Sequence, residues 1–371
     1  MDYTSLLNLH LSQTEIFVEK SKNNSYSDLD KKSYQDNLNK LFSAVKQSIS
    51  GVSAVGSVFE KQEHLSFICN SLEFLKDSIL SSMPFEVVNC LNMAMNDWID
   101  QQYIIVTSLN NNTLAFSYDP TLALEDFVYQ SIDIQYGITF AKRLVQINLP
   151  LILSRDYFSS VVLYHELGHF IDLKYAISKI VAMEVNSIPA SDFIQYEQFL
   201  VGGQNEIDIL IDHLAEYFCD IFAAQYIGKS SNYYLQYLTR NSSNASYSHP
   251  STINRVKVVD DFIDNKDNPI VELIKKITFN RSGRHLIKRH EDIVSDEFYK
   301  FLPIEIDNTA KLHGVFAYAW EIWLKGADDF KINAGLTGDF TSDNAYKVLN
   351  NLVEKSIGNY FIVKNWEASL T

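Results

Sequence analysis

The sequence has little cysteine, proline or glycine, and its acidic residues outnumber its basic ones. Among 371 residues there are 3 Cys, 7 Pro and 13 Gly, and 46 Asp and Glu against 31 Lys and Arg give a net charge of −15. The few, widely spaced cysteines exclude a disulfide framework and a cysteine zinc cage. The shortage of basic side chains argues against nucleic acid as a partner, because phosphate binding needs a Lys- and Arg-rich surface.

Long apolar runs are also missing. No stretch of about 18 apolar residues, the length that crosses a bilayer, occurs in the sequence. The first residues do not follow the pattern of a secretory signal, since acidic Asp2, Glu15 and Glu19 interrupt it. We therefore expect a reduced, cytoplasmic protein with no membrane span. Hydrophobic residues make up 46% of the chain, which is enough for a sizeable core.

Hydrophobic spacing divides the chain into three regions. Apolar residues recur every three or four positions up to residue 100, which predicts an all-α N-terminal region at 1–100. Residues 101–260 start with strand-like segments and continue with helical patterns, and 261–371 predict a C-terminal helical region. The expected fold class is therefore α+β, mostly helical, with a small sheet. Long helices are predicted after the sheet at residues 157–174, 206–226, 308–325 and 345–368.

The sheet is expected between residues 102 and 150. Segments rich in β-branched and aromatic residues predict strands at 103–106, 113–118 and 137–149. The asparagines at 110–112 are typical of a turn, so we expect a hairpin between the first two strands.

The clearest chemical motif is the sequence HELGH at residues 165–169. With about 3.6 residues per helical turn, His165 and His169 lie on one face, so both imidazoles can bind one metal ion while Glu166 lies at the adjoining rim. Apolar neighbours predict a buried helix, in which unpartnered imidazoles and a carboxylate would cost several kcal/mol. A metal ion relieves that cost. The alternative is that local carboxylates satisfy the two histidines.

A third metal ligand is expected downstream, because a catalytic zinc takes three protein ligands and leaves one position for water. In the predicted helix at 206–226, His213, Glu216 and Asp220 form a polar stripe on an otherwise apolar helix. Glu216 would supply the oxygen ligand, and Asp220 would accept the second ring N–H of a ligand histidine. His213, one turn away, competes with Glu216, or forms a hydrogen bond on the helix flank. Cys219 is interpreted as a small core residue.

A third motif, H-P-x-x-x-x-R, runs from His249 through Pro250 to Arg255. A metzincin pattern is excluded, because Asp172 and Tyr175 stand where that pattern needs glycine and histidine. In their order and internal spacing, HExxH, ExxxD and HPxxxxR resemble the M48 family of zinc peptidases, which are glutamate-ligated zincins, or gluzincins. The resemblance covers residues 165–255.

This resemblance implies a zincin-like catalytic core within residues 101–260 and a role for each motif residue. The zinc ligands would be His165, His169 and Glu216. Glu166 would act as general base on the zinc-bound water, and Asp220 would orient a ligand imidazole. His249 would lie beside the developing oxyanion, and Arg255 would anchor its loop through a carboxylate. General chemistry supports these roles, since hydrolysis needs an acidified water, a proton carrier and a donor to the tetrahedral oxygen.

Some assignments keep an alternative. His249 and Pro250 also fit an ordinary helix start with proline in the first turn. Tyr217 and Tyr247 are further oxyanion candidates by their position alone. The strand at 137–149 matches the edge strand on which zincins hold an extended peptide by main-chain hydrogen bonds.

The sequence therefore predicts a zinc-dependent endopeptidase, a hydrolase that acts on a protein or peptide substrate. Two other functions stay open: a zinc-binding interaction module without proteolysis, and a hydrolase of a non-peptide amide. Many M48 peptidases are membrane-embedded or secreted, whereas this sequence shows neither pattern, so their substrates are not carried over.

Overall fold

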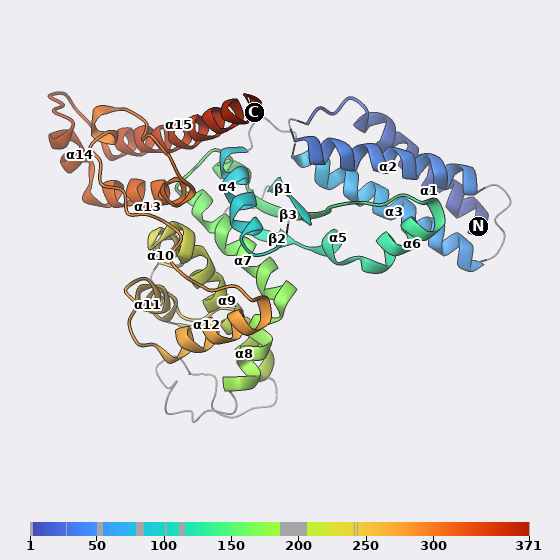
Figure 1. Cartoon of the computed structure of the whole chain (residues 1–371), viewed down its shortest axis with the longest axis horizontal. Coiled ribbons are helices and arrows are strands. Elements are labelled where there is room, and N and C mark those ends of the chain that lie inside the picture. Colours follow the sequence, from blue (N-terminus) through green and yellow to red (C-terminus); the bar gives the residue numbers. More distant parts are fainter. Residues whose placement is uncertain are drawn as a thin grey trace. The chain divides into compact units, whose positions relative to one another are not determined.

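The structure of the chain is a computed structural model that is mostly helical and contains a small sheet (Figure 1), which confirms the expected α+β class. It describes residues 3–26, 28–49, 55–78, 85–100, 102–110, 116–185, 206–240, 242 and 244–370.

The chain forms two compact units. Unit 1 combines Met1–Pro84 with Ile99–Ser154, and unit 2 combines Phe85–Trp98 with Arg155–Thr371. The chain passes between the units after residues 84, 98 and 154. The three regions suggested by hydrophobic spacing, with divisions near residues 100 and 260, stay a prediction. The candidate site lies in unit 2 together with the C-terminal helices.

Unit 1 is built on helices that pack beside one another and against a sheet. These are α1 (Tyr3–Ser21), α2 (Leu29–Ser48) and α3 (Val55–Asp77), with α5 (Thr121–Leu124) and α6 (Asp126–Tyr136) after the second strand. Buried leucines, valines and aromatic residues of α1–α3 form one core with residues of the sheet and α6. Their three- and four-residue spacing explains why this segment is helical.

The described strands form one three-stranded sheet in the order β1-β3-β2. β1 (Tyr103–Asn110) runs parallel to β3 (Arg143–Pro150), and β2 (Ser117–Asp119) runs antiparallel to it. The hairpin expected between the first two strands is therefore wrong, because each of them pairs with β3. The proposed turn at Asn111 and Asn112 lies outside the described residues.

The position of β3 overturns a second expectation. It is the central strand, with β1 bonded along one edge and β2 along part of the other. Its main-chain groups pair with β1 along residues 143–150 and with β2 at residues 146–148, so β3 is not the free edge strand on which a zincin would hold a peptide. Strand propensity predicts that a segment is extended, but the order of strands depends on pairing between distant segments.

His64 on α3 is a buried histidine in unit 1. Its Nε2 lies 3.0 Å from Ser131 Oγ and its Nδ1 lies 3.3 Å from Tyr136 OH, both on α6. Burial and the charge of Lys61 lower the pKa of His64 from 6.5 to about 4. The imidazole is therefore neutral in the folded chain at neutral pH.

This pKa predicts a loss of stability in mild acid. Between pH 6.5 and about 4 the unfolded chain binds a proton at His64 that the folded chain does not. The free energy of unfolding therefore falls as pH falls through this window, by about 1–2 kcal/mol at pH 5. Denaturant unfolding at pH 7 and pH 5 measures this difference, and His64→Gln is expected to reduce it. An equal difference in both proteins would contradict the assignment.

Unit 2 contains the remaining described helices. α4 (Phe85–Asn96) packs against α7 (Val162–Tyr175), which in turn packs along α9 (Glu206–Ile227). The other helices are α8 (Ile177–Val185), α10 (Ser230–Thr239), α11 (Thr252–Ile263), α12 (Pro269–Ser282), α13 (Thr309–Lys325), α14 (Ala327–Asn333) and α15 (Ser342–Ser369).

Local capping explains several of these helix boundaries. Ser251 accepts a hydrogen bond from the Asn254 N–H at the start of α11, and Thr341 forms a capping box with Asn344 at the start of α15. α7 begins later than the predicted residue 157, because residues 159–161 form a 3₁₀ turn before it.

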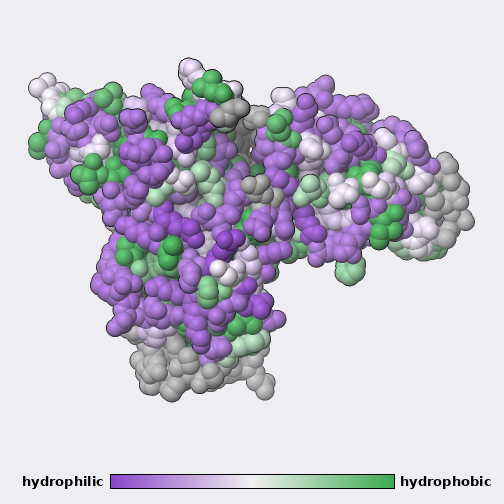
Figure 2. Space-filling view, viewed as in Figure 1, coloured by the Kyte–Doolittle hydropathy of each residue, from purple (hydrophilic) through white to green (hydrophobic). Residues whose placement is uncertain are grey.

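Hydrophilic side chains cover most of the coloured surface on the face drawn in Figure 2, and apolar ones are scattered among them. Among the helices that the structure describes, none combines the length and the apolar character needed to cross a membrane.

Candidate metal centre

The site is built where α7 and α9 approach each other closely. A Cβ atom added to Gly168 on α7 would lie 3.0 Å from the Cα of Cys219 on α9, so a larger residue at position 168 would push the helices apart. Glycine in the HELGH motif therefore has a packing role as well as a place in the pattern. This close crossing lets side chains of the two helices meet.

His165 is held between two carboxylates of α9. Its Nδ1 lies 3.0 Å from Asp220 Oδ1, and its Nε2 lies 3.3 Å from Glu216 Oε2. Although burial lowers the pKa of His165, these carboxylates outweigh it and raise the pKa to about 10. Asp220 thus occupies the position that the sequence predicted, at the second nitrogen of a candidate ligand.

His169 and His249 meet the other oxygen of the same carboxylate. His169 Nε2 lies 3.4 Å from Glu216 Oε1, and His249 Nε2 lies 3.6 Å from that oxygen. The side chain of His249 is 56% exposed, so it approaches the site from the solvent side. Glu216 is therefore the group around which the three predicted histidines gather.

Arg255 on α11 balances the carboxylates of α9. Its Nε and Nη2 each lie 2.7 Å from an oxygen of Asp220, and its Nη1 lies 2.9 Å from Glu216 Oε2. Although burial raises the pKa of Glu216, Arg255 and His165 hold it well below its ordinary value. Arg255 therefore ties α11 to α9, and the anchoring carboxylates are those of Asp220 and Glu216.

The spacing of the donor atoms fits a tetrahedral metal site. Zinc bonds to nitrogen and carboxylate oxygen of about 2.0–2.2 Å place neighbouring donors of a tetrahedron about 3.3–3.5 Å apart. His165 Nε2 lies 3.3 Å from Glu216 Oε2 and His169 Nε2 lies 3.4 Å from Glu216 Oε1, so each imidazole faces one oxygen of the carboxylate at a distance longer than most charge-assisted hydrogen bonds. Glu216 Oε2 is buried, and its neighbours are Arg255 Nη1 at 2.9 Å and His165 Nε2 at 3.3 Å. These donor types and separations therefore fit a metal ion between the two histidines and the Glu216 carboxylate.

The buried charges also fit a dication. Glu166, Glu216 and Asp220 are all buried, and Arg255 is the basic group beside them. In the metal-free protein a proton on His165 offsets part of this charge. With both histidines neutral, as metal binding requires, the groups carry two negative charges, which a dication would balance. Burial raises the pKa of Glu166 against the opposing effect of His165 and His169. A raised carboxyl pKa suits a group that must take up and release a proton near neutral pH.

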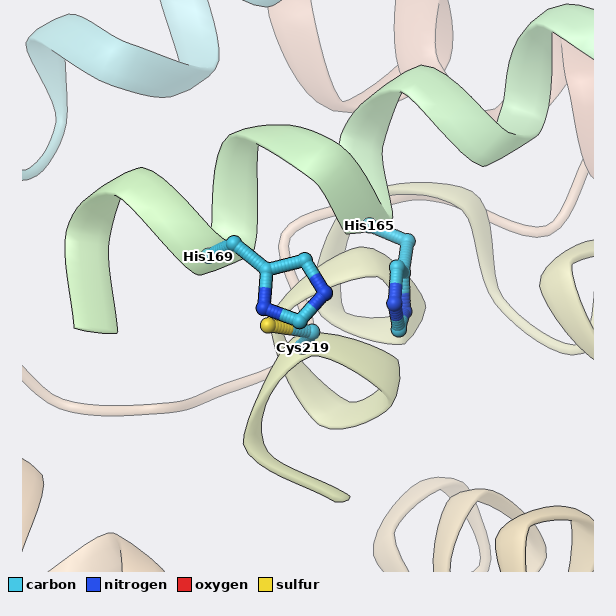
Figure 3. Close-up of side chains that lie close together, drawn as sticks. All are labelled: His165, His169 and Cys219. Carbon is cyan, nitrogen blue, oxygen red and sulfur yellow. The ribbon is translucent and has the colours of Figure 1, made fainter. Parts of the chain in front are cut away.

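Cys219 was not assigned to the site from the sequence. It is fully buried, as expected for a core residue, but its sulfur belongs to a cluster with ring nitrogens of His165 and His169 whose donor atoms lie within 4.8 Å of one another. Figure 3 shows the sulfur beside the His169 ring, on the side away from His165. Burial and the surrounding carboxylates raise the pKa of this thiol well above its ordinary value. In the sequence, the indication that Cys219 lies at the site was its position three residues after Glu216.

As a metal ligand in place of Glu216, His213 would have to face His165 and His169, but it bonds to a loop instead. Its Nε2 donates a hydrogen bond of 2.8 Å to the carbonyl oxygen of Ser246, in the loop that carries His249. Within that loop, Ser246 N–H donates to the carbonyl oxygen of His249, and His249 N–H donates to Ser246 Oγ. Glu216, one turn later on α9, is the residue that faces the histidine pair.

Replacing His213 by alanine is expected to loosen this loop. Loss of one buried hydrogen bond of about 1 kcal/mol predicts about a fivefold faster amide exchange at residues 246–249. Hydrogen exchange read by mass spectrometry measures the change, and His213→Gln, which keeps a donor, serves as the comparison. Unchanged exchange in the alanine variant would remove His213 as the anchor of the loop.

Pro250, Tyr217 and Tyr247 are the other residues that the sequence singled out, and their surroundings differ. His249 and Pro250 do lead into the start of a helix, as the alternative expected, but Pro250 precedes Ser251, the N-cap of α11, and so lies outside the first helical turn. Of the two tyrosine candidates, Tyr217 is 1% exposed and packs in the core, whereas Tyr247 is 84% exposed.

Comparisons with models of protein families, with curated proteins and with solved structures give no match. The resemblance to the M48 peptidases therefore stays a prediction from the three sequence motifs.

Proposed function

We propose that this chain is a zinc-dependent endopeptidase of the gluzincin type, with α7 and α9 as the two helices of a zincin-like core. The observation that carries the proposal is the meeting of His165, His169 and Glu216 at separations that suit one tetrahedral ion. Asp220 on the second nitrogen of His165 supplies the outer contact that metal-binding histidines usually have.

In this proposal zinc has the role that it has in hydrolytic zinc sites in general. When bound, it acts as a Lewis acid that acidifies a water molecule and polarises the carbonyl of the scissile bond. The protein positions the groups around it. Asp220 accepts the Nδ1–H of His165, which leaves Nε2 as the donor atom toward the ion. Arg255 neutralises part of the charge of Glu216 and Asp220 and keeps both in place.

Glu166 moves the proton in this mechanism. Its carboxylate takes a proton from the attacking water and delivers it to the nitrogen of the leaving amine, as a general base and then a general acid. The exposed His249 lies at the solvent side of Glu216, where its Nε2–H can donate to the oxygen of a tetrahedral species. The peptide or protein substrate would enter from this side.

Metal analysis of the purified full-length protein tests the proposal. About one zinc ion per chain is expected after loosely bound metal has been removed, and almost none in His165→Ala or Glu216→Ala. His213→Ala is the matched control, since His213 is buried on the same helix but bonds Ser246, and it is expected to keep the metal.

The same samples separate the alternative functions. Hydrolysis of unfolded casein by the zinc-loaded protein supports the endopeptidase. A stable zinc ion without hydrolysis of casein would favour the interaction module or a hydrolase of a small amide. A folded, metal-free protein in which the histidines pair only with Glu216 and Asp220 would overturn the metal site.

A further inference from the structure

Unit 1 contains a polar pocket that its own residues form. The pocket has a volume of about 300 Å³ and lies between the segment that follows α1 and the first half of α2. This volume is at the lower end of the range for small-molecule sites. The residues that line the pocket include Lys22 and Tyr26 after α1, and Lys32, Gln35, Asp36 and Asn39 on α2.

Two amide oxygens at this pocket are buried without a hydrogen-bond donor. Gln35 is 6% exposed, and its Nε2 donates a hydrogen bond of 2.6 Å to the carbonyl oxygen of Ser21 at the end of α1. Its Oε1 has no donor among the described residues, and neither has the buried Oδ1 of Asn39, one turn later on α2. Terminal amide torsions are soft, so each oxygen can turn toward a donor that enters the pocket. A ligand with N–H groups would therefore supply what both acceptors lack.

One charge of each sign stands unpaired beside these amides. Lys32 and Asp36 lie one turn apart on the exposed side of α2, and in the described part of the chain neither side chain forms an ion pair. Lys22, by contrast, is paired with Glu19 at 2.5 Å. The pocket therefore offers one ammonium and one carboxylate that are available to a ligand.

An α-amino acid carries the groups that match this lining. Its ammonium has three N–H donors, and three acceptors stand together on α2 in the amides of Gln35 and Asn39 and the carboxylate of Asp36. Its carboxylate can accept from the ammonium of Lys32. A sugar or other polyol could satisfy the two amides, but it would leave the charges of Lys32 and Asp36 without partners.

We propose that this pocket binds a free α-amino acid. Gln35, Asp36 and Asn39 hold its ammonium, Lys32 holds its carboxylate, and its side chain packs toward the half-buried ring of Tyr26. The site consists of residues of unit 1, so it is independent of the metal centre and of the function proposed for it.

Calorimetric titration of the full-length protein with each of the twenty standard amino acids tests the proposal. At least one is expected to bind with a Kd of about 1 mM or lower. Lys32→Gln and Asp36→Asn are each expected to weaken its binding about tenfold, because each removes a charge-assisted contact. The matched control is Lys40→Gln, which changes an exposed lysine of α2 that is not part of the pocket lining and should bind like the wild type.

Asn39→Leu separates a binding role from a structural one. It removes a buried oxygen that has no donor in the protein, so the thermal midpoint of unfolding is expected to rise while the amino acid binds about tenfold more weakly. A lower midpoint with unchanged affinity would contradict the role given to the amides.

Three results of the titrations would overturn the site. The first is that none of the twenty amino acids binds. The second is that ethylamine or propionate, which each carry one of the two charged groups, binds as tightly as the best amino acid. The third is binding of glucose in place of any amino acid, which would make the pocket a polyol site.

Discussion

Glu166→Gln is expected to lower kcat for peptide hydrolysis by about 10²–10⁴-fold while zinc stays bound. Glutamine keeps the shape of the side chain but cannot take a proton from water or return it to the leaving amine. Glu166 is buried beside the two histidines, and its pKa is raised by burial, as suits a proton carrier. The metal content should not change, since the proposed ligands are His165, His169 and Glu216.

Steady-state kinetics on a fluorogenic peptide, with zinc measured in the same samples, check this result. Asp208→Asn is a suitable control, because it removes an exposed acid at the start of α9. Loss of zinc together with activity in Glu166→Gln would mean that Glu166 is a ligand and that its assigned role is wrong. Full activity in this variant would exclude the general-base mechanism.

Arg255→Leu is expected to reduce the free energy of unfolding of unit 2 by about 3–5 kcal/mol in the metal-free protein. Arg255 is 6% exposed and contacts both Asp220 and Glu216, so its loss leaves two buried carboxylates with one compensating charge fewer. The effect comes from the uncompensated charges rather than from the lost packing of one side chain. Denaturant unfolding of both proteins measures it.

A second substitution on the same helix gives the matched control. Lys257 forms an ion pair of 2.5 Å with the buried Asp261, but the Lys257 side chain is 43% exposed and Asn268 also donates to that carboxylate. Lys257→Leu should therefore cost less than Arg255→Leu, at about 1 kcal/mol. Zinc is expected to stabilise Arg255→Leu more than the wild type, since the ion replaces part of the missing positive charge. A loss in Arg255→Leu no larger than that in Lys257→Leu would show that Arg255 does not balance buried charge.

Periodicity in the sequence predicted the helical character that the chain shows, and motif spacing predicted the histidine pair, Glu216 and Asp220 as residues of the candidate site. The pairing of His165 with His169 on one face follows from helix geometry alone, because residues four apart always lie close on one side of a helix. The same local rule placed Glu216 and Asp220 on a common stripe of α9. These predictions needed only the periodicity of segments that the structure shows to be α7 and α9.

The tertiary structure alone decided which side chains meet. Local spacing could not choose between Glu216 and His213 as the donor beside the histidines, since both lie on one face of α9. The angle at which α9 crosses α7 turns Glu216 toward the site, while the loop before α11 engages His213. The same crossing, made close by Gly168, brings Cys219 to His169.

The order of the strands was also not predictable from local sequence patterns. Composition predicted extended segments that overlap the three described strands, but it suggested a hairpin and an edge strand where the chain forms the order β1-β3-β2. Periodicity along a segment is set by its own backbone geometry, so the sequence determines it. Contacts between segments far apart in the chain depend on how whole surfaces pack and pair, and this depends on the tertiary structure.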